Sequence, residues 1–463
     1  MSSSTLPRVT AELLARYDRP GPRYTSYPTA VEFHDGFGAD EESDALTRAN
    51  AQPDEPLSLY FHIPFCESMC TFCGCSVVIR RDHEAAAPYL ERLRREIELV
   101  AERLPDRRKV VQLHWGGGTP NFLSEARMGA LFETITRHFT LTPDAEVALE
   151  IDPRTASPSQ IDFLRGLGFN RVSMGIQDFT PEVQQAVNRI QPEAMTRSIF
   201  DRARERGFES INVDLIYGLP FQTEETFQRT LDAVVNMAPD RVAVFSFAYV
   251  PWLKPHQRKI DAASMPATEA KFALFARAIE TFAAAGYQQI GMDHFAKPGD
   301  ELCRALERRK VGRNFQGYTV KETGDLIGFG MTAIGDVQGS YAQNLKELGE
   351  YFGAIDAGRL ATHRGILLTE EDKLRRFVIT ALMCNFAVSP AEVEARFDVR
   401  FREHFARELA ELAPLLDEGF IQDTGDWIEV TPLGRLFIRN VAMPFDTYLK
   451  RKSGEKPVFS RTV

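Results

Sequence analysis

The chain has 463 residues, 44% of them hydrophobic and 26% charged, which is the composition of a folded globular protein and not of a disordered, collagen-like or membrane-embedded one. Its 55 Lys and Arg against 65 Asp and Glu give a formal net charge of -10, which argues against general binding to nucleic acid or anionic lipid. No long apolar run follows the first residues, so we expect neither a signal peptide nor a transmembrane helix, and we expect a cytoplasmic location.

Residues 1–50 are expected to form an N-terminal arm. The spacing of apolar residues predicts one helix over residues 11–17. Residues 21–28, GPRYTSYP, are rich in proline and glycine, which resist regular structure. The arm is either a solvated leader or a lid over a site, and composition alone favours neither.

Between residue 57 and about residue 293, strand-like apolar runs alternate with helical patterns. Repeated βα units imply a parallel sheet, either a barrel or a doubly wound sheet. The predicted strands are residues 57–63, 110–115, 146–151, 171–176, 211–216 and 241–247, and the helices between them include residues 89–104, 125–139, 193–206 and 224–235.

Polar residues and glycines at the strand ends favour the barrel over the doubly wound sheet, because a βα barrel has its site at the carboxyl ends of successive strands. A doubly wound nucleotide-binding sheet would more often show a Gly-x-Gly-x-x-Gly turn, which is absent after the first strand here. We therefore predict an α/β fold with an incomplete parallel (β/α) barrel over residues 51–360, of which residues 300–360 look less regular. The strand-end residues are 116–120, Glu150, Asp152, Gln177, Asp178, Asp214 and Ala248.

From residue 361 to residue 463 the pattern changes to a mainly helical domain. Helices are predicted over residues 369–383, 390–397 and 401–416, followed by a hairpin of residues 419–423 and 427–430 and a further helix from Leu433. Three helices and a hairpin resemble a winged-helix unit. Because residues 370–372 are acidic, a packing role is favoured over DNA binding.

Four of the six cysteines, Cys66, Cys70, Cys73 and Cys75, follow the first barrel strand with the spacing C-x3-C-x2-C-x-C. This crowding favours a metal site in a reducing compartment over a disulfide framework. Three thiolates on one loop can hold three irons of a [4Fe–4S] cube and leave the fourth iron open. Zinc is the alternative, but zinc ligands usually come as pairs from separated segments. Cys75 is the candidate that lies near the cluster without binding it.

Several sequence segments resemble those of the oxygen-independent coproporphyrinogen III oxidases, a radical S-adenosylmethionine (SAM) family. The cysteine spacing is similar to the radical-SAM signature, and the similarity extends to residues 21–30, 291–296, 314–318 and 445–449. A heme-trafficking relative shares the core but lacks the fourth cysteine, so Cys75 and the arm favour the oxidase. The longest matching strings are residues 62–66, HIPFC; 114–120, HWGGGTP; 174–179, MGIQDF; and 214–220, DLIYGLP.

The resemblance implies that a radical made from SAM at a [4Fe–4S] cluster converts two propionates of coproporphyrinogen III to vinyl groups, giving protoporphyrinogen IX. It implies two SAM molecules, an unidentified electron donor and acceptor, and a monomer that binds neither nucleic acid nor membrane. Cys75 and Glu150 are the expected catalytic residues. The implied cluster ligands are Cys66, Cys70 and Cys73; the first SAM would contact Tyr60, Gly117, Glu150 and Ile334, and the second Phe72, Gly118, Thr119, Gln177, Arg189, Asp214 and Ala248.

A tetracarboxylate substrate needs cations in this acidic chain, and Arg23, with Arg258, Lys259 or Lys297, is the predicted source. Two rival hypotheses stay open at this point. One is a radical-SAM heme chaperone, and the other is a zinc-stabilised winged-helix protein that binds nucleic acid.

Overall fold

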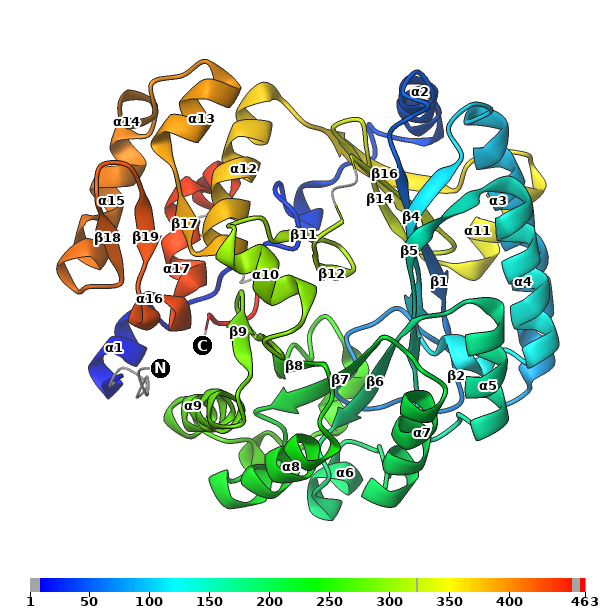
Figure 1. The fold of residues 1–463 in the computed structure, drawn as a ribbon, viewed down its shortest axis with the longest axis horizontal. Helices are drawn as coiled ribbons and strands as arrows, with labels where there is room; N and C mark the ends of the chain where they lie inside the picture. The colour runs from blue at the N-terminus through cyan, green and yellow to red at the C-terminus, as the bar shows by residue number, and fades with distance from the viewer. Residues whose placement is uncertain (1–8, 322–323, 452–458, 463) are drawn as a thin grey trace.

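The computed structural model describes residues 9–321, 324–451 and 459–462, so residues 1–8 of the predicted arm lie outside the described residues. One curved sheet forms the body of the molecule (Figure 1). At its centre, neighbouring parallel strands follow one another both in the chain and in the sheet, which confirms the predicted incomplete parallel barrel. These strands are β1 (Leu57–Ile63), β4 (Lys109–Gly117), β5 (Thr140–Ile151), β6 (Arg171–Gln177), β7 (Ser210–Tyr217) and β8 (Arg241–Ser246).

Helices cover the outer face of this sheet (Figure 1). In the first of them, α3, Leu90, Leu93, Ile97 and Val100 are buried at the i, i+3 and i+4 spacing that produces one apolar stripe facing the strands. The outer helices are α3 (Ala87–Arg103), α4 (Glu125–His138), α5 (Pro158–Leu167), α6 (Pro181–Ala186), α7 (Glu193–Glu205), α8 (Glu224–Met237) and α9 (Thr268–Ala284).

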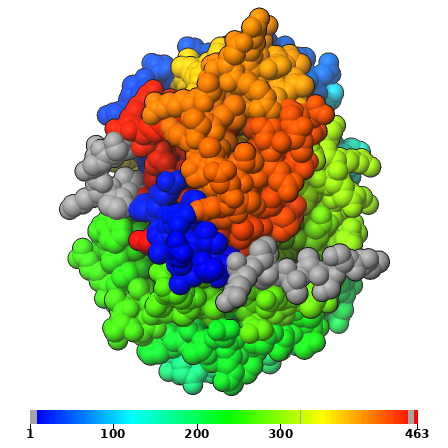
Figure 2. All heavy atoms as spheres, turned by 90° about the vertical axis from the view of Figure 1, so that its left-hand side faces the viewer, coloured from blue at the N-terminus to red at the C-terminus, as the bar shows by residue number. Residues whose placement is uncertain are grey.

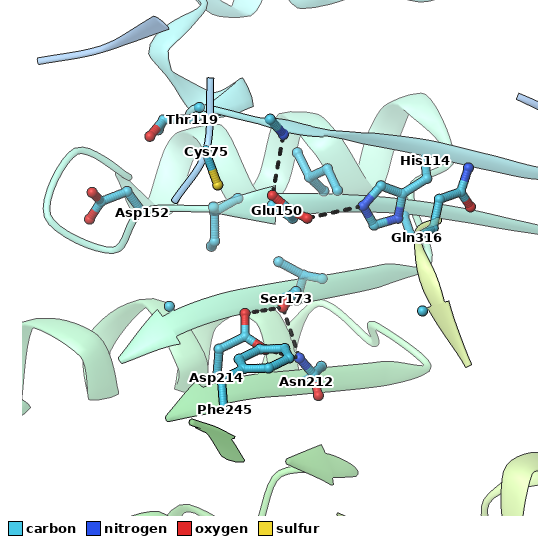
Figure 3. Close-up of a pocket in the computed structure, with 18 of the residues that line it drawn as sticks. Cys75, His114, Thr119, Glu150, Asp152, Ser173, Asn212, Asp214, Phe245 and Gln316 are labelled. Atoms are coloured by element: carbon cyan, nitrogen blue, oxygen red, sulfur yellow. Dashed lines mark hydrogen bonds and ion pairs between the residues drawn. The ribbon is translucent and has the colours of Figure 1, made fainter. Parts of the chain in front are cut away.

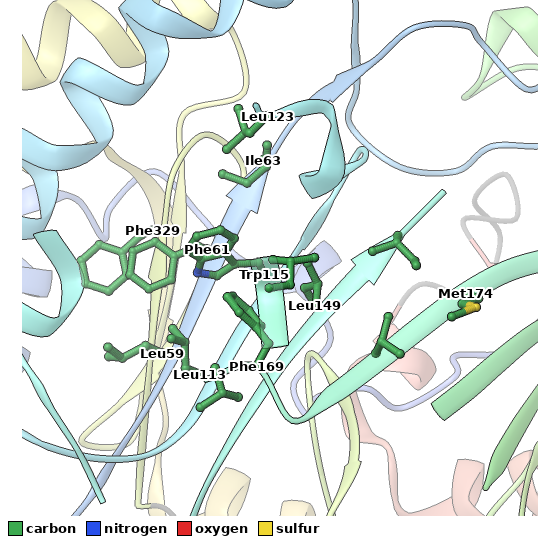
Figure 4. Close-up of a cluster of buried hydrophobic side chains, with 14 of the residues drawn as sticks. Leu59, Phe61, Ile63, Leu113, Trp115, Leu123, Leu149, Phe169, Met174 and Phe329 are labelled. Atoms are coloured by element: carbon green, nitrogen blue, oxygen red, sulfur yellow. The ribbon is translucent and has the colours of Figure 1, made fainter. Parts of the chain in front are cut away.

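The strands alternate between the core and the inside of the barrel. On β1, Leu57, Leu59, Phe61 and Ile63 are buried in the main core, while Ser58, Tyr60 and His62 fall between them. Figure 4 shows the core side, where Phe61 stacks on Phe329 with ring centroids 4.6 Å apart. The outward residues thus anchor the strand and leave the alternate positions for the site.

Both ends of the sheet carry further strands that were not predicted. β10 (His294–Ala296) and β9 (Gln288–Ile290) continue from β8, and β13 (Asp325–Phe329) pairs with β1 in parallel. The expectation of irregular structure over residues 300–360 is therefore wrong there. β13 and β15 are buried on both faces, so they lack the alternation of apolar and polar residues by which a strand is recognised. The remaining elements are β14 (Ile334–Val337), β15 (Ser340–Asn344), β16 (Thr362–Leu367), α10 (Glu301–Glu307), α11 (Leu348–Asp356), and the pairs β11 (Gly312–Asn314) with β12 (Gly317–Thr319) and β2 (Phe65–Cys66) with β3 (Val78–Ile79).

The C-terminal region is mainly helical, as predicted, and its hairpin is present. A second hydrophobic core holds this region together and includes Leu14 and Tyr17 of the N-terminal helix. The region comprises α12 (Glu370–Asn385), β17 (Ala387–Val388), α13 (Pro390–Phe397), α14 (Phe401–His404), α15 (Ala406–Asp417), β18 (Ile421–Asp423), β19 (Ile428–Val430), α16 (Pro432–Leu436), α17 (Ile438–Ala442) and α18 (Thr447–Arg451).

The N-terminal arm lies against the C-terminal region (Figure 2). Its first helix, α1 (Ala11–Tyr17), has the predicted bounds, but residues 39–50 form a second helix, α2 (Ala39–Asn50), that was not predicted. The buried Arg439 side chain donates to the carbonyl oxygens of Gly21, Pro22 and Arg461, so it holds the arm and the end of the chain together. Residues 9–50 of the arm therefore form an integral, packed segment and not a solvated leader.

A buried ion pair fastens the start of the barrel. Arg107 is fully buried, pairs with Asp325 of β13 and donates to the carbonyl oxygens of Ala49 and Glu55. We expect Arg107→Leu to lower the free energy of unfolding by about 3–5 kcal/mol, because it leaves the Asp325 carboxylate buried without its cation. Urea unfolding measures this loss, and Arg107→Leu combined with Asp325→Asn should recover part of it. Equal losses in the single and double variants would contradict the reason given.

Candidate active site

A cavity of about 390 Å³ lies inside the barrel, and Figure 3 shows part of its lining. Most of the predicted site residues border this cavity, although they come from six different segments of the chain. Those that line it are Cys66, Cys70, Phe72, Cys73, Cys75, Gly117, Gly118, Thr119, Glu150, Gln177, Arg189 and Asp214.

The cysteine loop is held by backbone hydrogen bonds from both sides. The Thr71 N–H donates to the Val187 carbonyl at 3.0 Å, and the Gly118 N–H donates to the Ile63 carbonyl at 2.8 Å. A side chain at Gly118 would place its Cβ 2.5 Å from the Pro64 carbonyl oxygen, so only glycine fits where β4 passes the loop. The triple-glycine run therefore lets two segments approach closely beside the cysteines.

Donors surround the sulfur of Cys70. Nη2 of Arg154 lies 3.5 Å from Cys70 Sγ, and Nη1 of Arg189 lies 3.6 Å from it. Both guanidinium groups also bind Asp152, where burial raises the pKa of the carboxyl but Arg189 and Arg154 outweigh this and lower it overall. The two guanidinium groups can donate hydrogen bonds to a metal-bound thiolate at this position. This donor set fits a thiolate-bound cluster.

Cys75 and Cys73 interact with each other. A hydrogen bond from Cys75 lowers the pKa of Cys73 to about 6, and the same contact raises the pKa of Cys75 well above its usual value. This contact therefore favours the protonated form of Cys75. Among the described residues no three His, Cys, Asp or Glu side chains already surround one metal position.

Glu150 reaches into the cavity from β5 (Figure 3). Its carboxylate lies 3.5 Å from Nε2 of His114 and accepts from the Gly117 N–H at 3.4 Å. The side chain is 46% exposed, but it lines the cavity, so its exposed part does not face bulk solvent. Burial raises the pKa of Glu150, and the hydrogen bonds from His114 and Gly117 outweigh it, so the pKa is lowered overall. Glu150 is thus an ionised acceptor.

Asp214 lies on the opposite wall of the cavity from Glu150 (Figure 3). Its carboxylate accepts from Ser173 Oγ at 3.0 Å and from Asn212 Nδ2 at 2.8 Å. Burial, followed by the charge of Glu150, raises its pKa from 3.8 to about 6. Two carboxyl groups facing one space suit a ligand with a positive charge or with several hydroxyl donors.

This raised pKa makes stability depend on pH. Because the folded pKa of Asp214 exceeds the unfolded one, the unfolded state binds fewer protons between these two values, and stability falls as pH rises from about 4 to about 6. Asp214→Asn cannot ionise, so it lacks this loss. The unfolding free energy of the variant minus that of wild type should therefore be roughly 2 kcal/mol larger at about pH 7.5 than at about pH 4.5. Urea unfolding of both proteins at both pH values measures the difference. An identical difference at the two pH values would contradict it.

Three predicted cofactor contacts do not line this cavity. The hydroxyl of Tyr60 lies 3.1 Å from Nδ1 of His62, and the carbonyl of Ala248 accepts from Nε2 of Gln257 at 3.1 Å. Ile334 begins β14 and packs beside a separate aromatic cluster that contains Phe33 and Tyr341. Their contacts with a cofactor remain predictions.

Several cavity residues were not predicted as site residues. Ser173 and Asn212 hold Asp214, and Arg154 stands beside Cys70. For Asn212 a sequence signal exists, because residues two apart on a strand share a face, and Asn212 is two residues before Asp214. Arg154 lies in the loop after β5, and no spacing rule points to it.

The proposed substrate cations are scattered. Arg23 pairs with Asp293, which in turn accepts from His294. Nζ of Lys297 donates to the Ala238 carbonyl, just before β8 begins, so Lys297 lies at the end of the barrel opposite to the cysteines. This placement corrects the expectation that Lys297 reaches the site. Arg258 and Lys259 are exposed on the 3₁₀ helix Pro255–Lys259, whose Gln257 donates to the Phe72 carbonyl.

Comparison with known proteins assigns this architecture. The Radical SAM superfamily matches residues 60–234, and the HemN C-terminal domain matches residues 368–437. The oxygen-independent coproporphyrinogen III oxidase of Synechocystis is 47% identical over 467 residues and covers 100% of both chains, and that of Escherichia coli is 45% identical over 97% of this chain and 98% of its own. A solved structure of the Escherichia coli coproporphyrinogen III oxidase, described as a radical SAM enzyme, has a TM-score of 0.89 and 46% identity over 92% of this chain and 97% of its own.

A partial parallel barrel with a four-cysteine loop at its mouth defines a radical SAM enzyme, which implies a [4Fe–4S] cluster and SAM as cofactors. The match along the whole chain is more specific. This chain belongs to the oxygen-independent coproporphyrinogen III oxidase family. Each helix of the described residues is too short or too polar to cross a membrane.

Proposed function

We propose that this enzyme oxidatively decarboxylates two propionate side chains of coproporphyrinogen III to vinyl groups without oxygen, giving protoporphyrinogen IX for heme biosynthesis. The observation that carries the proposal is one cavity that joins the cysteine loop to two opposed carboxyl groups, Glu150 and Asp214. The names of the relatives supply the substrate.

We infer that Cys66, Cys70 and Cys73 hold the cluster, and that Cys75 does not. The cluster and SAM, when bound, supply the 5′-deoxyadenosyl radical that removes hydrogen from a propionate. Thr119 supports this assignment, because its hydroxyl lies 3.2 Å from Cys66 Sγ, as do Arg154 and Arg189 beside Cys70. The three sulfurs would have to turn toward one point on binding the cluster.

The proposed catalytic residues are Glu150 and Cys75. Glu150 would hold the ribose hydroxyls of SAM, since an ionised carboxylate is a strong acceptor for two of them. Cys75, with its proton retained, would face the substrate from the same cavity.

Two SAM molecules are part of the proposal. We assign Tyr60, Gly117, Glu150 and Ile334 to the first SAM and the remaining predicted contacts to the second. Asp214 and Arg189 suit the ammonium and carboxylate of the second SAM, although Arg189 already binds Asp152 and the Gly175 carbonyl. Asp152 would then share the Arg189 guanidinium with the carboxylate of SAM. These second-site contacts are Phe72, Gly118, Thr119, Gln177, Arg189, Asp214 and Ala248.

The decisive experiment is an anaerobic assay with SAM, a strong reductant and coproporphyrinogen III. We expect protoporphyrinogen IX and two molecules of CO₂ per substrate. Chromatography and mass spectrometry detect the product. Binding of heme with no vinyl product would favour a heme chaperone, and a colourless zinc protein would refute both. We further propose a cytoplasmic monomer that takes electrons from a separate donor and binds neither nucleic acid nor membrane.

A further inference from the structure

Within the cavity, the arginines already have carboxylate partners. Arg154 and Arg189 bind Asp152, and Arg241 binds Asp300 at 2.8 Å. Arg171 pairs with Glu146 at 3.1 Å and also with Glu301. A substrate with four carboxylates therefore meets no surplus of positive charge on these walls, and its propionates need cations elsewhere.

The size of the cavity leads to the same conclusion. Ligand sites usually measure roughly 300–1,000 Å³, and this one, at about 390 Å³, is near the lower limit. SAM and a whole tetrapyrrole cannot both lie inside it. Part of the macrocycle, with its propionates, must extend past the mouth of the barrel.

Three cations meet at that mouth, and the sheet topology brings them there. Because β15 runs in the same direction as β1, its carboxyl end and the start of β16 lie at the edge of the sheet that carries the cysteine loop. Lys346 follows β15 by two residues, and Arg364 is the third residue of β16. Lys254 approaches from the loop after β8, where its Nζ lies 3.4 Å from the Cys75 carbonyl oxygen. Figure 1 shows these two ends of the sheet on either side of the open side of the barrel.

These cations have no carboxylate partner among the described residues. Arg364 donates to Oε1 of Gln343 at 2.8 Å, a neutral acceptor, and Lys346 is exposed. Burial, then Arg364 and then Lys254 lower the pKa of Lys346, so the three groups repel one another with no acid to offset them. Like charges gathered without a counterion are expected where an anionic ligand binds.

An apolar wall adjoins the cations. The guanidinium of Arg364 lies 5.9 Å from the ring centre of Phe33, which stacks on Tyr341 at 5.6 Å. Phe315 packs edge-on to Tyr341, and Ile334 borders the same cluster. Phe33 and Tyr341 are buried, while Phe315 and Ile334 at the border of the cluster are partly exposed. A partly exposed apolar border beside cations matches a ligand with a flat apolar ring system and peripheral carboxylates.

We propose that Lys254, Lys346 and Arg364 form a carboxylate-binding rim that holds the propionates of the tetrapyrrole that are not reacting, while Phe315, the partly exposed aromatic residue of the adjoining cluster, contacts the macrocycle. This inference rests on the proposed function and deepens it. It replaces Arg23 and Lys297, which have other partners, with residues near β15 and β16 and in the loop after β8 as the cations that bind the substrate.

The test measures binding apart from turnover. Coproporphyrin III, the stable oxidised form of the substrate, is titrated into the reconstituted enzyme by fluorescence quenching, for wild type, Lys346→Gln, Arg364→Gln and the double variant. We expect the double variant to raise the dissociation constant about tenfold or more, because it removes two charge-assisted contacts. Lys346→Arg should bind like wild type. Lys310→Gln, which removes an exposed lysine between α10 and β11, is the matched control.

The tetramethyl ester of coproporphyrin III separates charge from ring contacts. It should bind wild type as weakly as it binds the double variant, while iron content and SAM affinity stay unchanged in all variants. The proposal is overturned if the double variant binds the free acid as wild type does, or if wild type binds ester and acid equally. Absence of vinyl product from wild type would refute the proposed function instead, whatever the binding result.

Discussion

Serine in place of Cys66, Cys70 or Cys73 is expected to strip the enzyme of iron and lower the yield of protoporphyrinogen IX by more than about 100-fold, since thiolate is the ligand that iron–sulfur clusters require. All three cysteines border one cavity and have donors beside two of their sulfurs. Iron and sulfide analysis, with electron paramagnetic resonance of the reduced protein, measures the loss.

Cys75→Ser is the matched comparison, because it changes the same atom two residues away. The four irons should remain, because Cys75 is not one of the proposed ligands, and the vinyl product should decrease, because Cys75 lines the same cavity. Cys303→Ser, in a buried position of the second core, controls for the general effect of losing a thiol. Full iron content in Cys66→Ser would refute the ligand assignment, and loss of iron in Cys75→Ser would refute the distinction between the fourth cysteine and the others.

Glu150→Gln is expected to raise the dissociation constant for SAM by about 10- to 100-fold while leaving four irons per chain. The reason is that an ionised carboxylate accepting from two hydroxyls makes charge-assisted hydrogen bonds, each of which contributes about 1.5–3 kcal/mol, and the amide is a weaker acceptor. Equilibrium dialysis with labelled SAM on the reconstituted protein measures the affinity directly.

Glu146→Gln provides the control for this substitution. Glu146 lies on the same strand, four residues earlier, faces the same cavity and pairs with Arg171. It should leave SAM affinity within about twofold of wild type, a difference too small to reflect a lost charged contact. Equal effects of the two substitutions would show that the charge of the cavity, and not the position of Glu150, governs SAM binding.

The sequence predicted the barrel and its mouth well. The six central strands have strong apolar cores bounded by turn residues, so the runs at 57–63 and 171–176 differ from β1 and β6 by one residue at most. The strands that close the sheet were missed because β13 and β15 are short and buried on both faces, and α2 was missed inside a segment interpreted as an arm. The pairing of β13 with β1 also joins two strands that are distant in the chain.

The residues of the candidate site also fall into those that the sequence identified and those that it did not. Residues that belong to compact local patterns, the cysteine spacing and the glycine run before Thr119, were singled out directly from the sequence, and so were Glu150 and Asp214 at strand ends. Ser173 and Arg154 were not, because nothing in their own neighbourhood marks them, and Asn212 was missed although it lies two residues before Asp214 on the same strand. They became visible when β5, β6 and β7 were placed side by side.

The four-cysteine loop, the order of the parallel strands and the end of the barrel that carries the site all follow from spacing along the chain, because thiolate chemistry and strand periodicity act over a few residues. The rim of Lys254, Lys346 and Arg364 does not follow from it. Those residues lie up to 110 positions apart, and none has a local motif. They come together because β15 and β16 extend the sheet beyond β1 and turn its two ends toward one mouth, and charge acts through space between side chains that the fold has made neighbours.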